Sequence, residues 1–288
     1  MSFNAKAPSA FKKLGAVVLI TLTDCKQTSS GGGGGGKQKA PFVEGGASLI
    51  LSPDHLTIKV EAMTEDGSDI AVEGCEETTL KSNAWTELHA KGTKVILKGK
   101  ITKLNCGWNY LVAVNVQGLT ALQELDCFFN GLTELNVQGC TALQGLYCYY
   151  NQLTALNVQG LTSLQGLYCY HNKLTTLNVQ GCTALKELGC SDNQLTILNV
   201  QGLTSLKDVY CYSNQLNAQA MTELLQGLMA REASDDANAV LYTEEKDYTE
   251  GNCKDYNTPE DLKKAFEGAK NRQWYLAKFN ASGDDVDI

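Results

Sequence analysis

Apolar and polar positions recur with a fixed period of 21 residues through the middle of the chain. Copies two to five open with L-x-x-L-x-C-x-x-N-x-L and continue with T-x-L-N-V-Q-G-x-T-x, so apolar residues alternate with polar ones over short stretches. The first copy and the final half copy keep the pattern with Ile or Val at some of the Leu positions, and the first copy has Val112 in place of Thr. Such alternation predicts short strands. A period of this length indicates a solenoid, because one unit cannot bury its apolar side alone and must stack on its neighbours. Five complete copies and a half copy occupy residues 101–121, 122–142, 143–163, 164–184, 185–205 and 206–216.

The second half of each copy is too short for a helix. Its apolar i, i+2 spacing, as in residues 135–137, predicts a second strand. The glycine that follows, such as Gly139, permits the turn back. Because strands on both faces stack at the same ~4.8 Å, we expect a nearly straight, mainly β solenoid with little curvature.

The first eleven positions of each copy match the leucine-rich repeat pattern, with Cys in place of the third apolar residue. Residues 101–216 resemble the short bacterial, spirochaete-like, leucine-rich repeat surface lipoproteins, in which two half-motifs alternate. This resemblance implies a leucine-rich repeat β-solenoid. It also implies a role in attachment to host surfaces or to other bacteria.

Two constant columns are assigned to the core. The Asn at the ninth position is expected to pair with backbone groups from coil to coil. The Cys column is interpreted as small apolar core rather than disulfides, because parallel Cβ vectors hold neighbouring sulfurs apart. Cys140 and Cys182 are interpreted in the same way, and the lone Cys75 and Cys253 are expected to pack. The two columns are Asn109, Asn130, Asn151, Asn172, Asn193 and Asn214, and Cys106, Cys127, Cys148, Cys169, Cys190 and Cys211.

The N-terminus has the features of an exported protein. Three lysines precede the apolar run 14–22, which is too short to span a bilayer but suits a secretory signal over residues 1–24. The run, Cys25 and a Gly-rich tether over residues 25–45 together resemble a bacterial lipoprotein leader. That resemblance implies lipid attachment at Cys25 and a place at the bacterial cell envelope or surface, although Asp24 departs from the pattern. Ordinary secretion and an uncleaved leader stay open.

Both flanks of the repeats are predicted to be caps. Residues 46–100 are expected to form a small β module that covers the open end of the stack, with strands at 48–52, 56–64 and 69–74. Residues 217–288 are expected to form an α/β cap, with a helix from Asn217 to about Arg231, a strand at 239–243, a helix from Thr258 and a closing strand at 274–279.

The variable positions of the repeat indicate where function lies. Strand alternation turns positions 5 and 7 outward and places position 8 at the rim. These columns are rich in aromatic residues, and a large apolar patch of this kind is typical of a binding surface. The alternative is that cross-strand aromatic pairs only stabilise the sheet, by ~0.2–1 kcal/mol each. The expected ligand-binding residues are Trp108, Phe128, Phe129, Tyr147, Tyr149, Tyr150, Tyr168, Tyr170, His171, Tyr210 and Tyr212.

Charge and chemistry narrow the function classes. The net charge of -8 argues against nucleic acid as a partner. The three histidines lie in different contexts, and neither a paired metal-ligand motif nor a phosphate loop after a strand is present. We therefore expect no enzyme, cofactor or metal site, and membrane contact through the lipid anchor only. The predicted function is cell-surface recognition or adhesion, through a protein or glycan ligand at the aromatic face. The alternative is a structural component of the cell envelope in a permanent complex.

Overall fold

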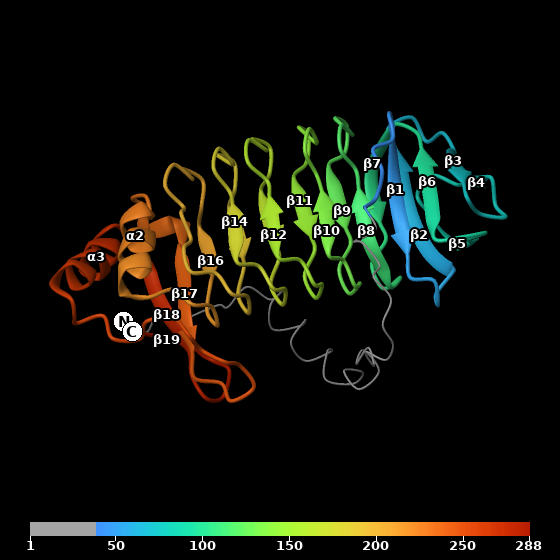
Figure 1. Ribbon diagram of the computed structural model, residues 1–288. Coiled ribbons are helices and arrows are strands. Elements are labelled where there is room, and N and C mark those ends of the chain that lie inside the picture. The colour runs from blue at the N-terminus through green and yellow to red at the C-terminus, as the bar shows by residue number, and fades with distance from the viewer. Residues whose placement is uncertain (1–38) are drawn as a thin grey trace. The chain divides into compact units, whose positions relative to one another are not determined.

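The computed structural model describes residues 39–288, which form a stack of coils with a cap at each end (Figure 1). The predicted signal peptide, Cys25 and most of the predicted tether lie outside the described residues. The last part of that tether packs on the stack, since Asn115 Nδ2 donates to the carbonyl of Ala40 at 3.0 Å. Each 21-residue copy is called a coil below, numbered one to five from residue 101, and the half copy is coil six.

The front of the stack is an eleven-stranded sheet. At its centre one short strand from each coil pairs in parallel with the next, and equivalent residues face each other, as Leu125, Leu146 and Leu167 do. This alternation confirms the strand prediction. The six strands are β7 (Ile101–Asn105), β9 (Glu124–Asp126), β11 (Gly145–Tyr147), β13 (Gly166–Tyr168), β15 (Glu187–Gly189) and β16 (Asp208–Tyr210).

The second half of each coil forms a strand on the back of the stack, as the spacing predicts. These strands are β8 (Leu111–Asn115), β10 (Glu134–Asn136), β12 (Ala155–Asn157) and β14 (Thr176–Asn178). The equivalent segment of coil five, residues 197–199, has no strand. Strands on both faces give the leucine-rich repeat β-solenoid that the repeat predicts.

The back strands pair two by two instead of continuously. β10 pairs with β8 and β14 with β12, and no ladder joins β10 to β12 within residues 39–288. The residue at position 19 of each coil explains which back strands pair. In coils two and four this position is Cys140 or Cys182, whose thiol lies 3.1 Å from a carbonyl oxygen of the preceding coil. In coil three it is the larger Leu161, which we infer keeps the coils apart.

Side chains bridge the junctions where the back strands do not pair. Gln138 Nε2 donates to the carbonyl of Asn157 at 2.8 Å, and Gln180 Nε2 donates to the carbonyl of Asn199 at 3.3 Å. The front sheet therefore repeats every coil, whereas the back repeats every second coil.

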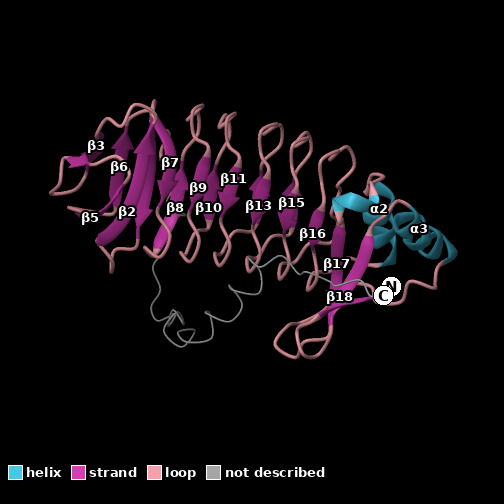
Figure 2. Cartoon of the chain, turned by 180° about the vertical axis from the view of Figure 1, so that it is seen from behind, coloured by secondary structure: helices cyan, strands magenta, loops and turns pink. Residues whose placement is uncertain are grey.

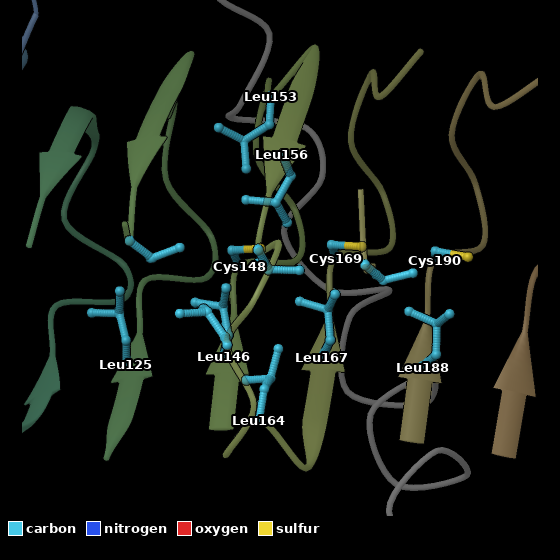
Figure 3. Close-up of a cluster of buried hydrophobic side chains, with 14 of the residues drawn as sticks. Leu125, Leu146, Cys148, Leu153, Leu156, Leu164, Leu167, Cys169, Leu188 and Cys190 are labelled. Atoms are coloured by element: carbon cyan, nitrogen blue, oxygen red, sulfur yellow. The ribbon is translucent and has the colours of Figure 1, made fainter. Parts of the chain in front are cut away.

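The interior consists of leucine and cysteine columns (Figure 3). The six position-six cysteines are fully buried, and no disulfide forms among the described residues, as the sequence predicts. Burial raises the pKa of the Cys148 thiol to about 12. The thiol therefore stays protonated, and the column acts as packing rather than as redox chemistry.

The position-nine asparagines form the predicted ladder. Asn151 Nδ2 donates to the carbonyls of Cys127 and Cys148, both at 3.0 Å, and its Oδ1 accepts from the Leu132 amide at 3.0 Å. The ladder extends beyond the repeats at its C-terminal end. There Asn252 Nδ2 donates to the carbonyls of Cys211 and Leu241, both at 2.8 Å, which adds a rung that the repeat pattern does not predict.

The N-terminal cap continues both sheets. β2 pairs antiparallel with β7 at the front, and β1 pairs antiparallel with β8 at the back. The cap thus covers the backbone edges that a bare first coil would expose. Its strands are β1 (Gly46–Leu51), β2 (Thr57–Thr64), β3 (Ile70–Glu73), β4 (Thr79–Leu80), β5 (Ala84–His89) and β6 (Lys94–Lys98). The three predicted strands are present, whereas β4 and β5 were not predicted.

The C-terminal cap adds two parallel strands to the front sheet, and helices replace the back strands in their connections (Figure 2). Asn217 caps the first helix as predicted, accepting from the Ala220 amide at 2.9 Å. This helix ends at Gly227 rather than near Arg231, because the Leu228 carbonyl turns away to accept from Arg272 Nε at 2.8 Å. The elements are α2 (Ala218–Gly227), η2 (Ala233–Asp235), β17 (Asn238–Thr243), α3 (Glu260–Asn271), β18 (Tyr275–Phe279) and β19 (Asp285–Asp287).

Neither α2 nor α3 has the length and apolar character that a bilayer crossing requires, and no other helix in residues 39–288 does.

Replacing Cys140 with Leu should open the back of the junction between coils one and two. The larger side chain overfills the site, so the free energy of unfolding should fall by about 1–3 kcal/mol. The amides of Val116 and Gly118, which donate to coil two at 3.0 and 2.9 Å, should exchange hydrogen faster. The Cys127 amide in the front sheet is the internal control. Unchanged protection of Val116 and Gly118 would contradict the role given to position 19.

Candidate recognition face

Position 8 carries a column of stacked rings along the edge of the front sheet, here called the rim column. The ring centroids are 4.0 Å apart for Trp108 and Phe129, 4.2 Å for Phe129 and Tyr150, and 4.1 Å for Tyr150 and His171. The ring planes differ by no more than 17°. Each ring therefore faces its neighbours along the solenoid axis and presents an edge to solvent.

The backbone at position 8 is left-handed in every coil. The φ angle is 60° at Trp108, 48° at Phe129 and 53° at Tyr150. Bulky residues rarely adopt this conformation, which costs of order 1–3 kcal/mol. The next residue is the ladder asparagine, whose buried hydrogen bonds fix the turn. Stacking of ~0.5–1.5 kcal/mol per ring pair offsets much of the strain.

Position 7 forms a second column directly inside the rim. The centroids of Phe128 and Tyr149 are 4.9 Å apart, and those of Tyr149 and Tyr170 are 4.6 Å apart. Tyr149 also meets the edge of the Phe129 ring at 6.0 Å. As a result Tyr149 is only 7% exposed, which corrects the prediction that it projects freely outward.

Coil five interrupts both columns with Ser191 and Asp192, and a ring from the C-terminal cap packs into the gap. Tyr248 lies 5.8 Å from His171 and 5.4 Å from Tyr212, centroid to centroid. Tyr212 in turn meets Phe279 edge-on at 5.1 Å. Tyr248 lies in an insertion outside the repeat register, so the 21-residue pattern does not predict it.

Position 5 contributes one stacked pair, Tyr147 and Tyr168, whose rings are 5.1 Å apart and nearly parallel. Tyr210 does not join this pair. It is 3% exposed, so the expectation of an accessible ring is wrong here as well. Gly189 separates it from Tyr168 in the strand register.

The exposed end of the rim column is Trp108. Its side chain is 60% exposed, and within residues 39–288 Phe129 is its one stacking partner. Tyr110 in the same loop is 50% exposed and stacks on His55 of the N-terminal cap at 4.0 Å. The structure therefore shifts the accessible aromatic surface toward coil one.

Acidic groups lie beside the aromatic columns. Burial, together with the nearby Glu124, raises the pKa of Asp126 to about 7, and Lys103 opposes this shift. Burial and Glu187 raise the pKa of Asp208 to about 6. Lys103 pairs with Glu124 at 2.9 Å. Both aspartates are thus easier to protonate near neutral pH than an exposed carboxyl.

The His, Cys, Asp and Glu side chains of residues 39–288 form no cluster that could hold a metal ion. His171 pairs through Nδ1 with Asp192, which ties the end of the rim column to coil five.

No family model matches the chain, and a search of the curated proteins finds no match. Among solved structures, the chain is similar to the functional domain of InlJ from Listeria monocytogenes, which is described as including a cysteine ladder. The two are 27% identical with a TM-score of 0.34, and the match covers 49% of this chain and 39% of that one.

Asp126→Asn should stabilise the protein at high pH but not at low pH. The ordinary carboxyl pKa of 3.8 is raised to about 7 in the folded state, so the folded chain holds this proton more tightly than the unfolded chain. The resulting stabilisation is complete below about pH 4 and is lost as the pH rises through 7. The amide cannot ionise, so we expect a gain of about 1–2 kcal/mol at pH 8, discounted for solvent screening.

Urea denaturation of the wild-type chain and of Asp126→Asn at low and high pH measures this difference. A difference that is the same at pH 4 and pH 8 would contradict the assigned pKa shift.

Proposed function

We propose that this chain is a non-enzymatic recognition module displayed outside a bacterial cell, which binds a protein or glycan through the front of the solenoid. The observation that supports this most directly is the pair of aromatic columns on one surface. Coils two to four place rings at positions 7 and 8 in unbroken register. Trp and Tyr dominate binding hot spots because they offer large contact areas at low entropic cost.

The stacking geometry specifies how a partner would meet this face. Inside the columns the ring faces are occupied by other rings, so a partner meets ring edges there. At Trp108 a ring face remains accessible, and it suits an apolar, aromatic or cationic group. The net charge of -8 favours a partner with some basic character.

A structural role in the cell envelope is the second candidate, and the burial of Tyr149 favours it. Rings that are nearly inaccessible stabilise the sheet rather than bind a ligand. Under this alternative, a second subunit covers Trp108 and Tyr110 permanently. The state of the purified protein separates the two roles, because a stable monomer supports recognition and an obligate complex supports the structural role.

Export and lipid anchoring at Cys25 complete the proposal, supported by the apolar run 14–22, the glycine tether and the resemblance to lipoprotein leaders. The cysteine columns are compatible with an oxidising exterior. Their thiols are fully buried with raised pKa values, and the thiolate is the form that oxidises readily.

Trp108→Ser should weaken partner binding at least about tenfold, because it removes the accessible ring face. It should cost only about 0.5–1.5 kcal/mol of stability, since one stacking contact is lost. The full chain is screened against an array of extracellular proteins and glycans, and the affinity of each binder is then compared between variants. Ile197→Ser is the control, because Ile197 is also 60% exposed but belongs to the back half of coil five. If every binder has the same affinity for Trp108→Ser as for Ile197→Ser, the proposed site is contradicted.

Cys25→Ser should move the protein from the detergent phase to the aqueous phase when bacteria that express the full chain are extracted with a phase-separating detergent. The reason is that a diacyl anchor adds apolar chains that the serine variant cannot carry. Cys253→Ser is the control, because it removes a half-buried thiol from the C-terminal cap. Identical partitioning of the wild-type chain and Cys25→Ser would rule out lipidation.

A further inference from the structure

A shallow trough of about 400 Å³ runs along the front sheet beside Tyr147 and Tyr168. It extends from coil one to coil five. Its floor lies at position 3, which is Gly145 in coil three and Gly166 in coil four, whereas coils two and five have Glu124 and Glu187 there. The trough is therefore a depression in the sheet surface with an acidic side chain at each end.

The two tyrosines form one wall. Each ring leans over the glycine of its own strand, where an added Cβ would lie 3.0 Å from the Tyr147 ring or 3.1 Å from the Tyr168 ring. Because the rings stack on each other, they present edges to the trough rather than faces. The Tyr168 hydroxyl donates to Glu187, so the Tyr147 hydroxyl is the one that a ligand would meet. This wall suits a ligand that is bound by hydrogen bonds along its length.

A column of glutamines at position 2 forms the other wall. The side chains of Gln123 and Gln144 are exposed, and within the described residues no protein group hydrogen-bonds to their amides. Gln165 Oε1 accepts from Lys186 Nζ at 3.1 Å. The side-chain amides of Gln123 and Gln144 can thus bind an external ligand.

The amides on the back of the solenoid differ. Asn136 Nδ2 donates to Gln117 Oε1 at 3.0 Å, and Gln138 Nε2 donates to a backbone carbonyl. The side-chain amides on the back therefore hold the coils together. Those of Gln123 and Gln144 on the front make no such contact between coils.

The charges of the trough cancel. Lys103 pairs with Glu124 at 2.9 Å at one end. At the other end Lys186 donates to Gln165, and Glu187 accepts from the Tyr168 hydroxyl. A neutral ligand avoids the repulsion that a polyanion would meet at the two glutamates or a polycation at the two lysines.

The spacing of the wall selects among neutral ligands. From coil two to coil four the amides recur once per coil, at ~4.8 Å. A β-1,4-linked hexopyranose chain advances by one sugar over nearly the same distance and turns over at each sugar. Each coil would therefore meet one sugar, and the same hydroxyl groups would return to this wall at every second coil. An extended peptide returns side chains to one face only every ~6.6–6.8 Å, and falls out of step within two coils.

We propose that this trough binds a neutral, linear, β-linked glycan, with the glutamine amides and the Tyr147 hydroxyl hydrogen-bonding to its sugar hydroxyls. This inference rests on the proposed recognition role of the front sheet and names its ligand class. Coils one to five span four steps, or about 19 Å, which corresponds to about four sugar units.

Titration calorimetry of the full chain with β-1,4-linked gluco-oligosaccharides and N-acetylglucosamine oligosaccharides of about two to six units tests the inference. We expect the affinity for at least one series to rise with each added unit up to about four, and then to level off. The double variant Gln123→Ala with Gln144→Ala should lower this affinity at least about tenfold. The matched control, Gln152→Ala with Gln194→Ala, changes two exposed glutamines at position 10 and should leave it unchanged.

The absence of binding by both series to the folded wild-type chain would overturn the inference. So would binding that both double variants lose equally, or binding of extended peptides that only the position-2 double variant loses. If the glycans fail while a binder still depends on Trp108, the trough assignment is wrong and the proposed recognition function stands. If glycan binding is found and no binder depends on Trp108, the trough is the functional site of the face.

Discussion

An asparagine amide at position 9 closes the front turn of every coil and ties that coil to the one before it or, in coil one, to the N-terminal cap. In coil three, Asn151 joins the carbonyls of Cys127 and Cys148 to the Leu132 amide, all at 3.0 Å. Backbone groups buried at this turn would otherwise be unpaired, at a cost of about 1–3 kcal/mol each. The same contact sets the coil-to-coil register at the front, and therefore the spacing of everything that projects from it.

The properties of the candidate recognition face follow from that register. The asparagine fixes a left-handed backbone at position 8, and one coil spacing then brings successive rings into stacking distance. Rings that stack along the axis have their faces occupied. The surfaces that a partner can reach are therefore the ring edges, Trp108 at the end of the rim column and the neutral trough beside Tyr147. On the back, where no such turn exists, the size of residue 19 decides which coils pair.

The residues of the 21-residue repeat predict the core of the solenoid better than they predict its surface. The asparagine and cysteine columns could be assigned from sequence because each has one constant residue and one physical task. The alternation of Leu161 with Cys140 at position 19 predicts core packing only, because the sequence does not show how the back strands pair. The direction of the ring stacks could not be predicted, because it depends on the left-handed turn at position 8. Tyr248 and Asn252 were missed, because an insertion places them outside the 21-residue spacing although they continue the columns in space.

The most direct test of this account is the free energy of unfolding of Asn151→Ala, measured by urea denaturation together with the near-ultraviolet circular dichroism of the stacked rings. Asn157→Ala, which changes an exposed asparagine in the same coil, is the reference. We expect a loss of about 2–4 kcal/mol and a weakened aromatic signal for Asn151→Ala only, because several buried groups lose their partners at once. Equal stability and an unchanged aromatic signal in the two variants would contradict the central place given to the asparagine ladder.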